Sequence, residues 1–366
     1  MQFVITRESL LRPLQIVSGV IERRQTLPVL SNVLLVLDGT SLSITGTDLE
    51  VELIATAEVS KSGIPGSVTV PARKLLDICK SLPDDTLIEV SLSDSKLTVK
   101  CGRSRFILAT LPATDFPSVE EEPNTFAICV DQIRLKSILE GTSFAMAQQD
   151  VRYFLNGMLF ELSPGYLRVV ATDGHRLALE TLAIEGALEE KKQVILPRKG
   201  VMELVKLLGE GESVDLTFGR SHLRAKVSGF TFTSKLVDGS FPDYNRVIPK
   251  GGDKIVVGDV NNLKQGFLRA SILSNEKYRG VRMVLTKDEV RILANNPEQE
   301  EAEECVTVDY DGDPLEMAFN VGYVIDVLST VRSEQVKVSL SDASSSVLIE
   351  EVAGGDALYV VMPMRL

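Results

Sequence analysis

Residues 75–92 read LLDICKSLPDDTLIEVSL. In 75–82 the apolar residues recur at i, i+3, i+4 and i+7, which predicts an amphipathic helix with one buried stripe. In 88–92 apolar and polar residues alternate, which predicts a β-strand. The same two patterns occur in phase twice more. The helical stripes are Leu75, Ile78, Cys79 and Leu82, then Val201, Leu204, Val205 and Leu208, then Val324, Val327, Leu328 and Val331. The strands are Ile88, Val90 and Leu92, then Val214, Leu216 and Phe218, then Val336, Val338 and Leu340.

This repetition predicts that the chain is three copies of one unit. One third of 366 residues is 122, so the copies fill the chain and leave no room for a separate catalytic domain. We place the repeats at 1–125, 126–253 and 254–366, with boundaries in the polar, turn-like stretches Pro123-Asn124 and Gly251-Gly252-Asp253. Each repeat is predicted as a strand, a helix, several strands, a second helix and three more strands. The fold class is therefore α+β, with two helices backed by β-sheet in each of three similar domains.

Composition excludes some classes of protein. The chain has 39 basic and 51 acidic residues, a formal charge of −12, which argues against a protein that coats nucleic acid nonspecifically. Tryptophan is absent and aromatic residues make up 5%, so an aromatic platform for stacking bases is not expected.

The predicted helices differ from the rest of the chain in charge. They hold 15 basic and 7 acidic residues, a charge of +8, which leaves −20 elsewhere. The helices counted are 7–24, with Pro13 as a kink, and 72–82, 131–149, 197–208, 261–275 and 321–332. These charges either form ordinary solvated helix faces or, if the helices share one face, a basic surface for sequence-independent contact with phosphates.

Helix packing relates this surface to DNA. Helices pack roughly 8–10 Å apart, so side chains would fill a circle of six of them. A circle of twelve leaves roughly 25 Å clear, enough for a duplex about 20 Å wide. If helices line the hole, a closed head-to-tail dimer of this chain is thus the smallest ring that could hold DNA.

The cysteines and the N-terminus indicate a reducing environment. Cys79, Cys101, Cys129 and Cys305 show no CxxC spacing, so we expect reduced core thiols, with a disulfide or a metal site as the alternatives. No apolar run approaches the ~18–20 residues of a membrane span. The N-terminus lacks the pattern of a signal peptide. We expect a soluble, cytoplasmic protein without cofactors.

Several segments, in this order and spacing, carry a resemblance to a known family. They are TLP (26–28), TGTDLE (45–50), QDVRYFLNG (149–157), ATDGHRL (171–177), FPDY (241–244), ANNPEQEE (294–301) and VMPMRL (361–366). Along its full length the chain resembles the beta subunits of bacterial DNA polymerase III, the replicative sliding clamps. The resemblance implies a homodimeric, head-to-tail ring of six domains around duplex DNA, with helices lining the hole. It also implies partners: the replicative polymerase catalytic subunit, the clamp loader, and other DNA polymerases and repair proteins that carry clamp-binding peptides.

The resemblance assigns DNA contacts and a pocket for partner peptides between the second and third repeats. The DNA contacts map onto Arg24, Arg73, Gln149, Tyr153 and Phe154; the family often has a second tyrosine at 154. The pocket maps onto Leu155, Thr172, Gly174, His175, Arg176, Leu177, Pro242, Arg246, Val247, Tyr278, Asn320, Tyr323, Ser344, Ser346, Val360, Met362, Pro363, Met364 and Arg365. Its apolar residues suit aliphatic and aromatic anchors, and its arginines suit peptide carbonyls or carboxylates. Position 344 is often apolar in the family, so Ser344 is expected to alter affinity there.

The family's subunit interface maps onto opposite charges in the first and third repeats. It comprises Lys96, Lys100, Arg103, Arg105, Phe106 and Leu108, facing Ile272, Leu273, Glu298, Glu300, Glu301, Glu303 and Glu304. Two other interpretations of the glutamates remain, a cation site and a solvated strand or loop. Rim charges of this kind set register more than affinity.

An enzyme is disfavoured. His175, one of only two histidines, has no nucleophile motif beside it, and the matching turn of the first repeat lacks histidine. The sequence has no P-loop, GxGxxG or HExxH motif. The sequence thus favours a processivity factor that tethers a polymerase by topology. The alternative is a repeat scaffold that binds proteins but not DNA.

Overall fold

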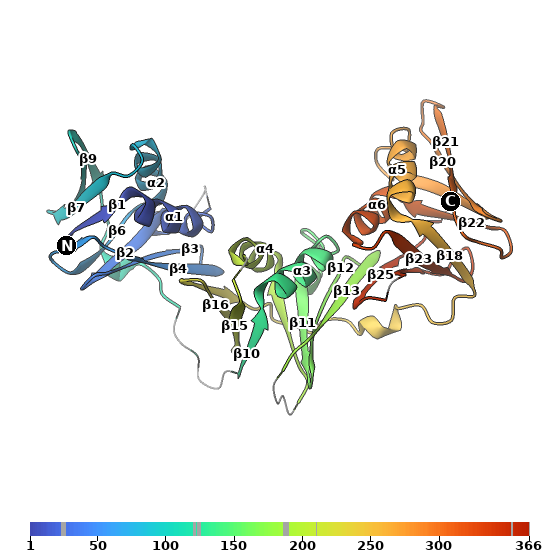
Figure 1. The fold of residues 1–366 in the computed structure, drawn as a ribbon, viewed down its shortest axis with the longest axis horizontal. Helices are drawn as coiled ribbons and strands as arrows, with labels where there is room; N and C mark the ends of the chain where they lie inside the picture. The colour runs from blue at the N-terminus through green and yellow to red at the C-terminus, as the bar shows by residue number, and fades with distance from the viewer. Residues whose placement is uncertain are drawn as a thin grey trace. The chain divides into compact units, whose positions relative to one another are not determined.

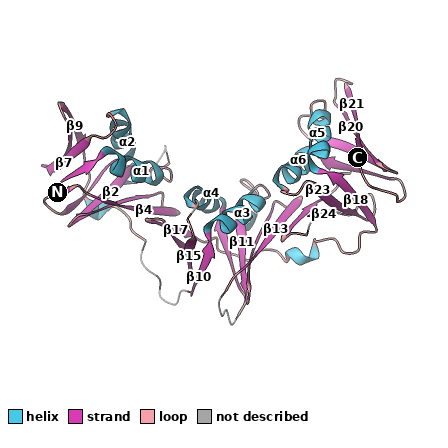
Figure 2. Ribbon diagram, viewed as in Figure 1, coloured by secondary structure: helices cyan, strands magenta, loops and turns pink. Residues whose placement is uncertain are grey.

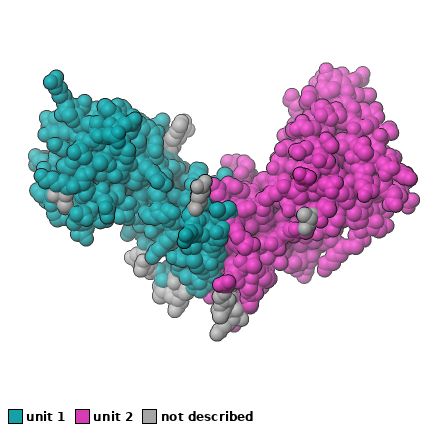
Figure 3. Space-filling view, viewed as in Figure 1, with its two compact units in different colours: residues 1–133, 202–236 teal, residues 134–201, 237–366 magenta. Residues whose placement is uncertain are grey.

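The computed structural model describes residues 1–22, 27–119, 122, 126–185, 190–209, 211–352 and 354–365. These residues form two compact units (Figure 3). Unit 1 contains residues 1–133 and 202–236, and unit 2 contains residues 134–201 and 237–366. The boundary falls inside the second repeat, within α3 (Gln132–Ser143) and α4 (Arg198–Leu207).

Unit 1 contains two antiparallel sheets and the helices α1 (Arg7–Val17) and α2 (Ala72–Ser81) (Figure 1). The first sheet is β5 (Lys61–Ser62), β1 (Gln2–Thr6), β7 (Leu87–Ser93), β8 (Lys96–Cys101) and β9 (Ser104–Ala109). The second is β10 (Phe126–Asp131), β15 (Ser213–Phe218), β16 (His222–Val227), β17 (Phe230–Lys235), β4 (Val51–Glu58), β3 (Ser41–Thr47), β2 (Asn32–Asp38) and β6 (Gly66–Pro71). Pairing of β17 with β4 makes this one sheet out of strands from two repeats.

Unit 2 also contains two antiparallel sheets, with α5 (Val260–Ser271) and α6 (Val321–Thr330) lying side by side in the third repeat (Figures 1 and 2). The larger sheet is β14 (Lys192–Pro197), β11 (Gly157–Ser163), β12 (Tyr166–Thr172), β13 (Arg176–Ala183), β25 (Ala357–Val361), β24 (Val347–Glu351), β23 (Gln335–Leu340) and β18 (Lys254–Asp259). The smaller is β21 (Glu301–Thr307), β20 (Glu289–Asn295), β19 (Gly280–Thr286) and β22 (Leu315–Asn320). Here β13 and β25 join the second repeat to the third.

The predicted order of strands and helices is confirmed in each repeat, and so is the α+β class. Of the twelve residues in the three helical stripes, ten are buried, while Ile78 and Val205 are half-buried. Side-chain caps begin three of the helices: Thr6, Asp259 and Asn320 accept hydrogen bonds from backbone N–H groups in the first turn of α1, α5 and α6.

Three predicted helices end at least four residues earlier than expected. The first ends at Val17 rather than at residue 24, and Pro13 lies inside it. The third ends at Ser143 rather than at residue 149, because the chain turns there to begin the segment that leads into β11. The helix predicted at 261–275 ends at Ser271. None of the described helices is long and apolar enough to cross a membrane.

The prediction of four core thiols was wrong for two of them. All four cysteines are free, but Cys129 and Cys305 are exposed, because each occupies an outward-facing position of its alternating strand. Cys101 is half-buried. Cys79 is buried in α2, and burial raises the pKa of its thiol to about 12.

Gly157 is a sensitive position of the larger sheet in unit 2. A Cβ there would lie 2.6 Å from the carbonyl oxygen of Leu196 on the paired strand β14 and 2.9 Å from the side chain of Ile195. We expect Gly157→Ala to separate these strands and to lower the free energy of unfolding by about 1–3 kcal/mol, measured by urea unfolding. Gly209→Ala, with no heavy atom within 4 Å of its Cβ, is the control. Equal stability of the two variants would contradict this account.

Candidate functional site

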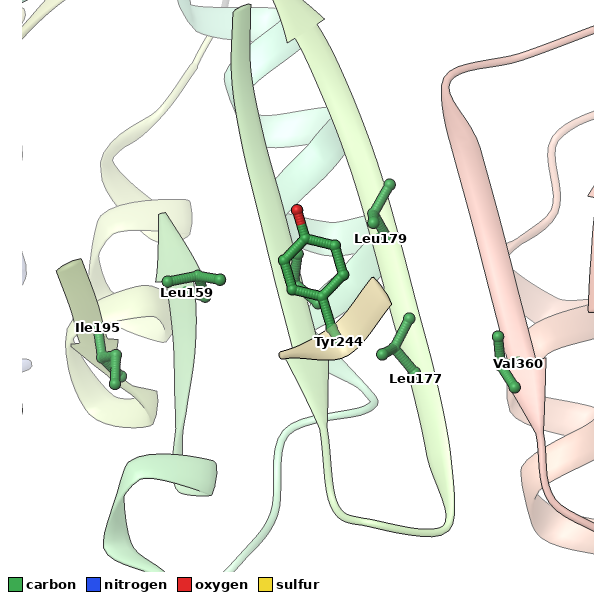
Figure 4. Close-up of a cluster of buried hydrophobic side chains, with 7 residues drawn as sticks. Leu159, Leu177, Leu179, Ile195, Tyr244 and Val360 are labelled. Atoms are coloured by element: carbon green, nitrogen blue, oxygen red, sulfur yellow. The ribbon is translucent and has the colours of Figure 1, made fainter. Parts of the chain in front are cut away.

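The site begins with a cluster of buried side chains in unit 2 (Figure 4). Four strands of the second repeat and β25 of the third contribute to it, and Tyr244 covers it from a short 3-10 helix, η4 (Tyr244–Arg246). The cluster consists of Leu159, Val170, Leu177, Leu179, Ile195, Tyr244 and Val360. Because both repeats supply side chains, this floor exists only where β13 and β25 pair.

Polar contacts hold Tyr244 over the cluster. Its hydroxyl donates to Glu161 Oε1 at 3.0 Å and accepts from Arg168 Nη1 at 3.2 Å. Glu161 is 1% exposed and also accepts from Lys191 Nζ and Gln193 Nε2, each at 2.7 Å. Burial raises the pKa of Glu161, but the donated hydrogen bonds outweigh it and lower the pKa below its ordinary value. The segment carrying Tyr244 is thus fixed on the sheet by a satisfied, ionised network.

A mainly apolar pocket of about 180 Å³ lies beside this floor. Nine of the predicted pocket residues line it: Leu155, Thr172, Gly174, Arg176, Leu177, Pro242, Val247, Val360 and Met362. Sequence reasoning missed four others: Arg152, Phe241, Asp243 and Tyr244. All four lie within the segments 149–157 and 241–244, which carry the resemblance, and their place in these segments could have identified them as pocket residues.

The other predicted pocket residues are distributed around this cavity. Arg246 and Ser346 line a polar hollow of about 690 Å³ that shares Asp243 and Val247 with the pocket. Tyr278 lines a separate hollow of about 860 Å³ in the third repeat. Ser344 donates its hydroxyl to Asp342, and hydrogen bonds from Ser345 and Ser344 lower the pKa of that aspartate to about 2.

The last residues of the chain form a wall next to the second repeat. The Met362 N–H donates to the His175 carbonyl at 2.9 Å, and the Met364 N–H donates to the Ala318 carbonyl at 2.7 Å. Between them Pro363 is half-buried, whereas Arg365 is exposed.

The rings of His175 and Tyr323 stack with centroids 6.3 Å apart, which brings together the second and third repeats. Asn320 caps the helix that carries Tyr323.

Arg176 lies at the centre of this arrangement and is only 12% exposed. Its Nε donates to Asp173 at 3.0 Å, its Nη2 donates to the Phe144 carbonyl at 2.7 Å, and its Nη1 pairs with Asp326 of α6. Its guanidinium lies 4.6 Å from the centre of the Tyr323 ring. Arg176 therefore holds the pocket walls together.

Arg246 differs sharply from Arg176, since its side chain is 84% exposed. Among the described residues, its one ion pair is with the exposed Asp243 of its own turn. Of these two arginines, Arg246 is the one exposed to solvent.

The predicted DNA contacts fall in both units. Arg24 lies outside the described residues. Arg73 is exposed on α2, and Gln149 is exposed with a φ of 57° in the turn before η3 (Tyr153–Leu155). Tyr153 is 58% exposed, whereas Phe154 is half-buried and packs on the floor cluster, with the two rings edge to face 5.9 Å apart. Tyr153 is thus the ring presented to solvent.

The predicted interface residues lie on or near two sheet edges. β9 is the last strand of its sheet in unit 1, and β21 is the last strand of its sheet in unit 2. Near β9, four exposed cations have no ion pair among the described residues: Lys96, Lys100, Arg103 and Arg105. Phe106 is half-buried and Leu108 is 7% exposed, whereas Ile107, which sequence reasoning missed, is 51% exposed.

The edge formed by β21 is acidic. Glu304 forms two 2.8 Å hydrogen bonds with Arg269, and Glu303 lies 3.4 Å from Arg291. The exposed glutamates of this region are Glu298, Glu300, Glu301 and Glu303. Nearby, Ile272 is 76% exposed and Leu273 is half-buried. Within the described parts of the chain, no three His, Cys, Asp or Glu residues are grouped so that they could hold a metal ion.

Comparison with known proteins identifies the family. Models of the DNA polymerase III beta subunit match along the chain: the N-terminal domain at residues 1–120, the central domain at 129–243 and the C-terminal domain at 245–365. The chain belongs to the DNA polymerase III beta subunit family.

Individual relatives of this family agree over the whole chain. The beta sliding clamp of Pseudomonas putida is 59% identical, with 100% of both chains covered. The crystal structure of the beta subunit from Pseudomonas aeruginosa is 58% identical and matches with a TM-score of 0.98 over 100% of both chains. A structure of the Pseudomonas aeruginosa clamp bound to griselimycin matches with a TM-score of 0.97 at 58% identity, again over 100% of both chains. The chain therefore has the DNA clamp fold and the function of a DNA sliding clamp, a processivity subunit that is not itself catalytic.

The contrast between the two arginines of this clamp can be tested. Arg176→Ala removes contacts to two repeats and leaves Asp173 and Asp326 without their cation, so we expect it to lower the free energy of unfolding by about 1–3 kcal/mol. Arg246→Ala removes one exposed ion pair and is expected to leave stability unchanged. Differential scanning calorimetry measures both. Similar melting temperatures for the two variants would show that Arg176 does not hold the walls.

Proposed function

We propose that two copies of this chain close head to tail into a ring around duplex DNA and thereby keep the replicative polymerase on its template. The observation that carries this proposal is the pair of sheet edges, since β9 and β21 each end a sheet and the charges around them are opposite. Exposed strand edges present unpaired backbone groups and readily pair with another chain. Pairing of β9 with β21 of a second copy would satisfy both edges.

Side chains around the edges support that pairing. The cations of the first repeat, Lys96, Lys100, Arg103 and Arg105, would face the exposed glutamates of the third. Ile272 and Leu273 would cover the apolar side chains of β9. Rim charges would steer approach and fix register, while the backbone and the apolar contacts supply most of the affinity. The proposed domain limits are 1–125, 126–253 and 254–366, so the ring has six domains.

The proposed contacts with DNA are few and independent of sequence. Arg24 and Arg73 would contact phosphates of the DNA. Near the pocket, a DNA strand would contact Gln149, Tyr153 and Phe154. Since Phe154 packs on the floor cluster, stacking on a base falls mainly to Tyr153. Weak phosphate contacts suit a clamp, because tight contacts would slow sliding.

We further propose that the pocket between the second and third repeats takes short peptides from partners. Its apolar lining suits aliphatic and aromatic anchors, and the exposed Arg246 suits a carbonyl or carboxylate of the peptide. The partners proposed are the polymerase catalytic subunit, the clamp loader, and other polymerases and repair proteins. Griselimycin, which binds a close relative, is proposed to occupy the same pocket. The ring would work in the cytoplasm, without a cofactor.

Topological linkage distinguishes a clamp from an ordinary DNA-binding protein. We expect the protein, loaded by a clamp loader with ATP, to stay on nicked circular DNA and to leave the same DNA after linearisation, measured by gel filtration of the complexes. Arg73→Glu should load less, because it reverses a charge proposed to face phosphate. Equal retention on circles and on linear DNA would contradict a ring. A scaffold that does not bind DNA would be unaffected by the Arg73 substitution.

The two charged edges make a separate prediction about the dimer. Arg103→Glu combined with Arg105→Glu should weaken the dimer at least tenfold, and the loss should be smaller in high salt, where the charges are screened. Adding Glu301→Lys and Glu303→Lys should recover affinity. Sedimentation velocity measures the dimer, and Lys61→Glu, exposed at the opposite edge of the same sheet, is the control. An unchanged dimer in the first double variant would rule out this interface.

A further inference from the structure

A second arginine crosses between the repeats at a distance from the pocket. Arg332 follows α6 of the third repeat, and its Nη2 donates to the Ser137 carbonyl of α3 at 2.6 Å. Its two terminal nitrogens each lie 3.3 Å from an oxygen of Glu180 on β13. Its backbone N–H donates to Glu351 at 2.9 Å. One residue of the third repeat thus binds both a helix and a strand of the second.

Glu180 is an unusual partner because it is buried. The residue is 2% exposed and lies beneath α3, where Gly141 allows close approach. A Cβ at position 141 would lie 1.7 Å from Glu180 Oε1, so no other residue fits there while the carboxylate is in place. The remaining titratable neighbours are Tyr359, 3.5 Å away, and Glu351. Burial raises the pKa of Glu180 to about 7, although Arg332 opposes this effect.

Together, Arg176 and Arg332 fix α6 at two places. Within the helix, Arg176 of the second repeat pairs with Asp326 and lies against Tyr323. Beyond its end, Arg332 reaches back to α3 and β13. At the first of these places α6 holds Arg176, which lines the pocket, and its Tyr323 stacks on His175.

We infer that Arg332, with Glu180 and Gly141, is a positioning group for the peptide pocket. This group holds α6 against the second repeat, so that the pocket is already formed before a ligand arrives. None of the three lines the pocket. Loss of the crossing leaves α6 held against the second repeat by Arg176 and by the stack of Tyr323 on His175, and a ligand must then fix Arg176 as it binds. The apparent affinity then equals the intrinsic affinity multiplied by the fraction of molecules whose pocket is in the competent arrangement. This inference rests on the proposed function of the pocket.

Calorimetric titration of the full-length protein with griselimycin tests the inference. We expect Arg332→Gln to weaken binding about three- to tenfold. Arg332→Lys should recover part of the loss, since a lysine keeps the charge near Glu180. Lys337→Gln is the matched control: it removes a 2.8 Å ion pair with Glu350 in the same sheet without affecting contacts between repeats. The inference would be overturned if the Arg332→Gln variant bound griselimycin as tightly as the wild type does. It would also be overturned if Lys337→Gln weakened binding as much as Arg332→Gln.

The proposed function and the inference fail differently in this experiment. Absence of binding to the wild-type protein would overturn the proposed pocket itself. Binding to wild type with no effect of Arg332→Gln would overturn only the positioning role.

Gly141 supplies an independent test that does not depend on the charge of Arg332. We expect Gly141→Ala to displace the Glu180 carboxylate and to weaken griselimycin binding. In a Glu180→Ala background the contacts of 1.7 and 2.7 Å with the carboxylate are absent and only a 3.0 Å contact with Arg332 Nη2 remains, so adding Gly141→Ala should cause a smaller further loss. Strict additivity of the two losses would contradict the contact on which the inference depends.

Discussion

Backbone pairing between β13 and β25 joins the second and third repeats into one eight-stranded sheet, and much of unit 2 depends on that pairing. The register places Leu177 opposite Val360, so that both side chains join the floor cluster. The same register carries Glu180 beneath α3, within reach of Arg332. A shift of one residue would turn every side chain of β13 to the opposite face and remove the floor. The pocket is therefore a consequence of how two repeats share a sheet.

Two buried carboxylates of this sheet show how differently the same group can be accommodated. Glu161 accepts from three donors at 2.7–3.0 Å, and these bonds keep it ionised despite burial. Glu180 faces one guanidinium at 3.3 Å and the Tyr359 hydroxyl at 3.5 Å, and burial outweighs both contacts. A folded-state pKa above the unfolded value means that the folded chain holds its proton more tightly between about pH 4.5 and 7. Ionised Glu180 therefore lowers the free energy of unfolding above that range. This loss of stability is compatible with a residue that positions the pocket, but not with one whose role is only to stabilise the fold.

The sequence predicted the repeated elements well because their information is local. Spacing of Leu75, Cys79 and Leu82 marks a buried helix face whatever its neighbours are. Helix ends depend on where the following chain turns, and there the expectation that α1 continues past Val17 was wrong. The pocket and interface residues came from resemblance, since no local pattern marks them. The crossing of Arg332 to Glu180 had no signal at all, because these residues are 152 positions apart and each alone resembles an ordinary surface charge.

The boundaries between domains of the proposed ring are of two kinds. Inside the chain, β17 with β4 and β13 with β25 connect repeats by continuous backbone hydrogen bonding, and the second connection is reinforced by arginines that reach buried or half-buried partners. Between chains, β9 and β21 would add exposed charges that salt screens. A ring that must admit DNA has to open at one boundary while the others hold. Opening at an internal boundary would break buried structure, and at the second connection it would also destroy the pocket. Opening at the charged edges would break neither, so the contact between copies is the one whose rupture leaves each clamp subunit intact.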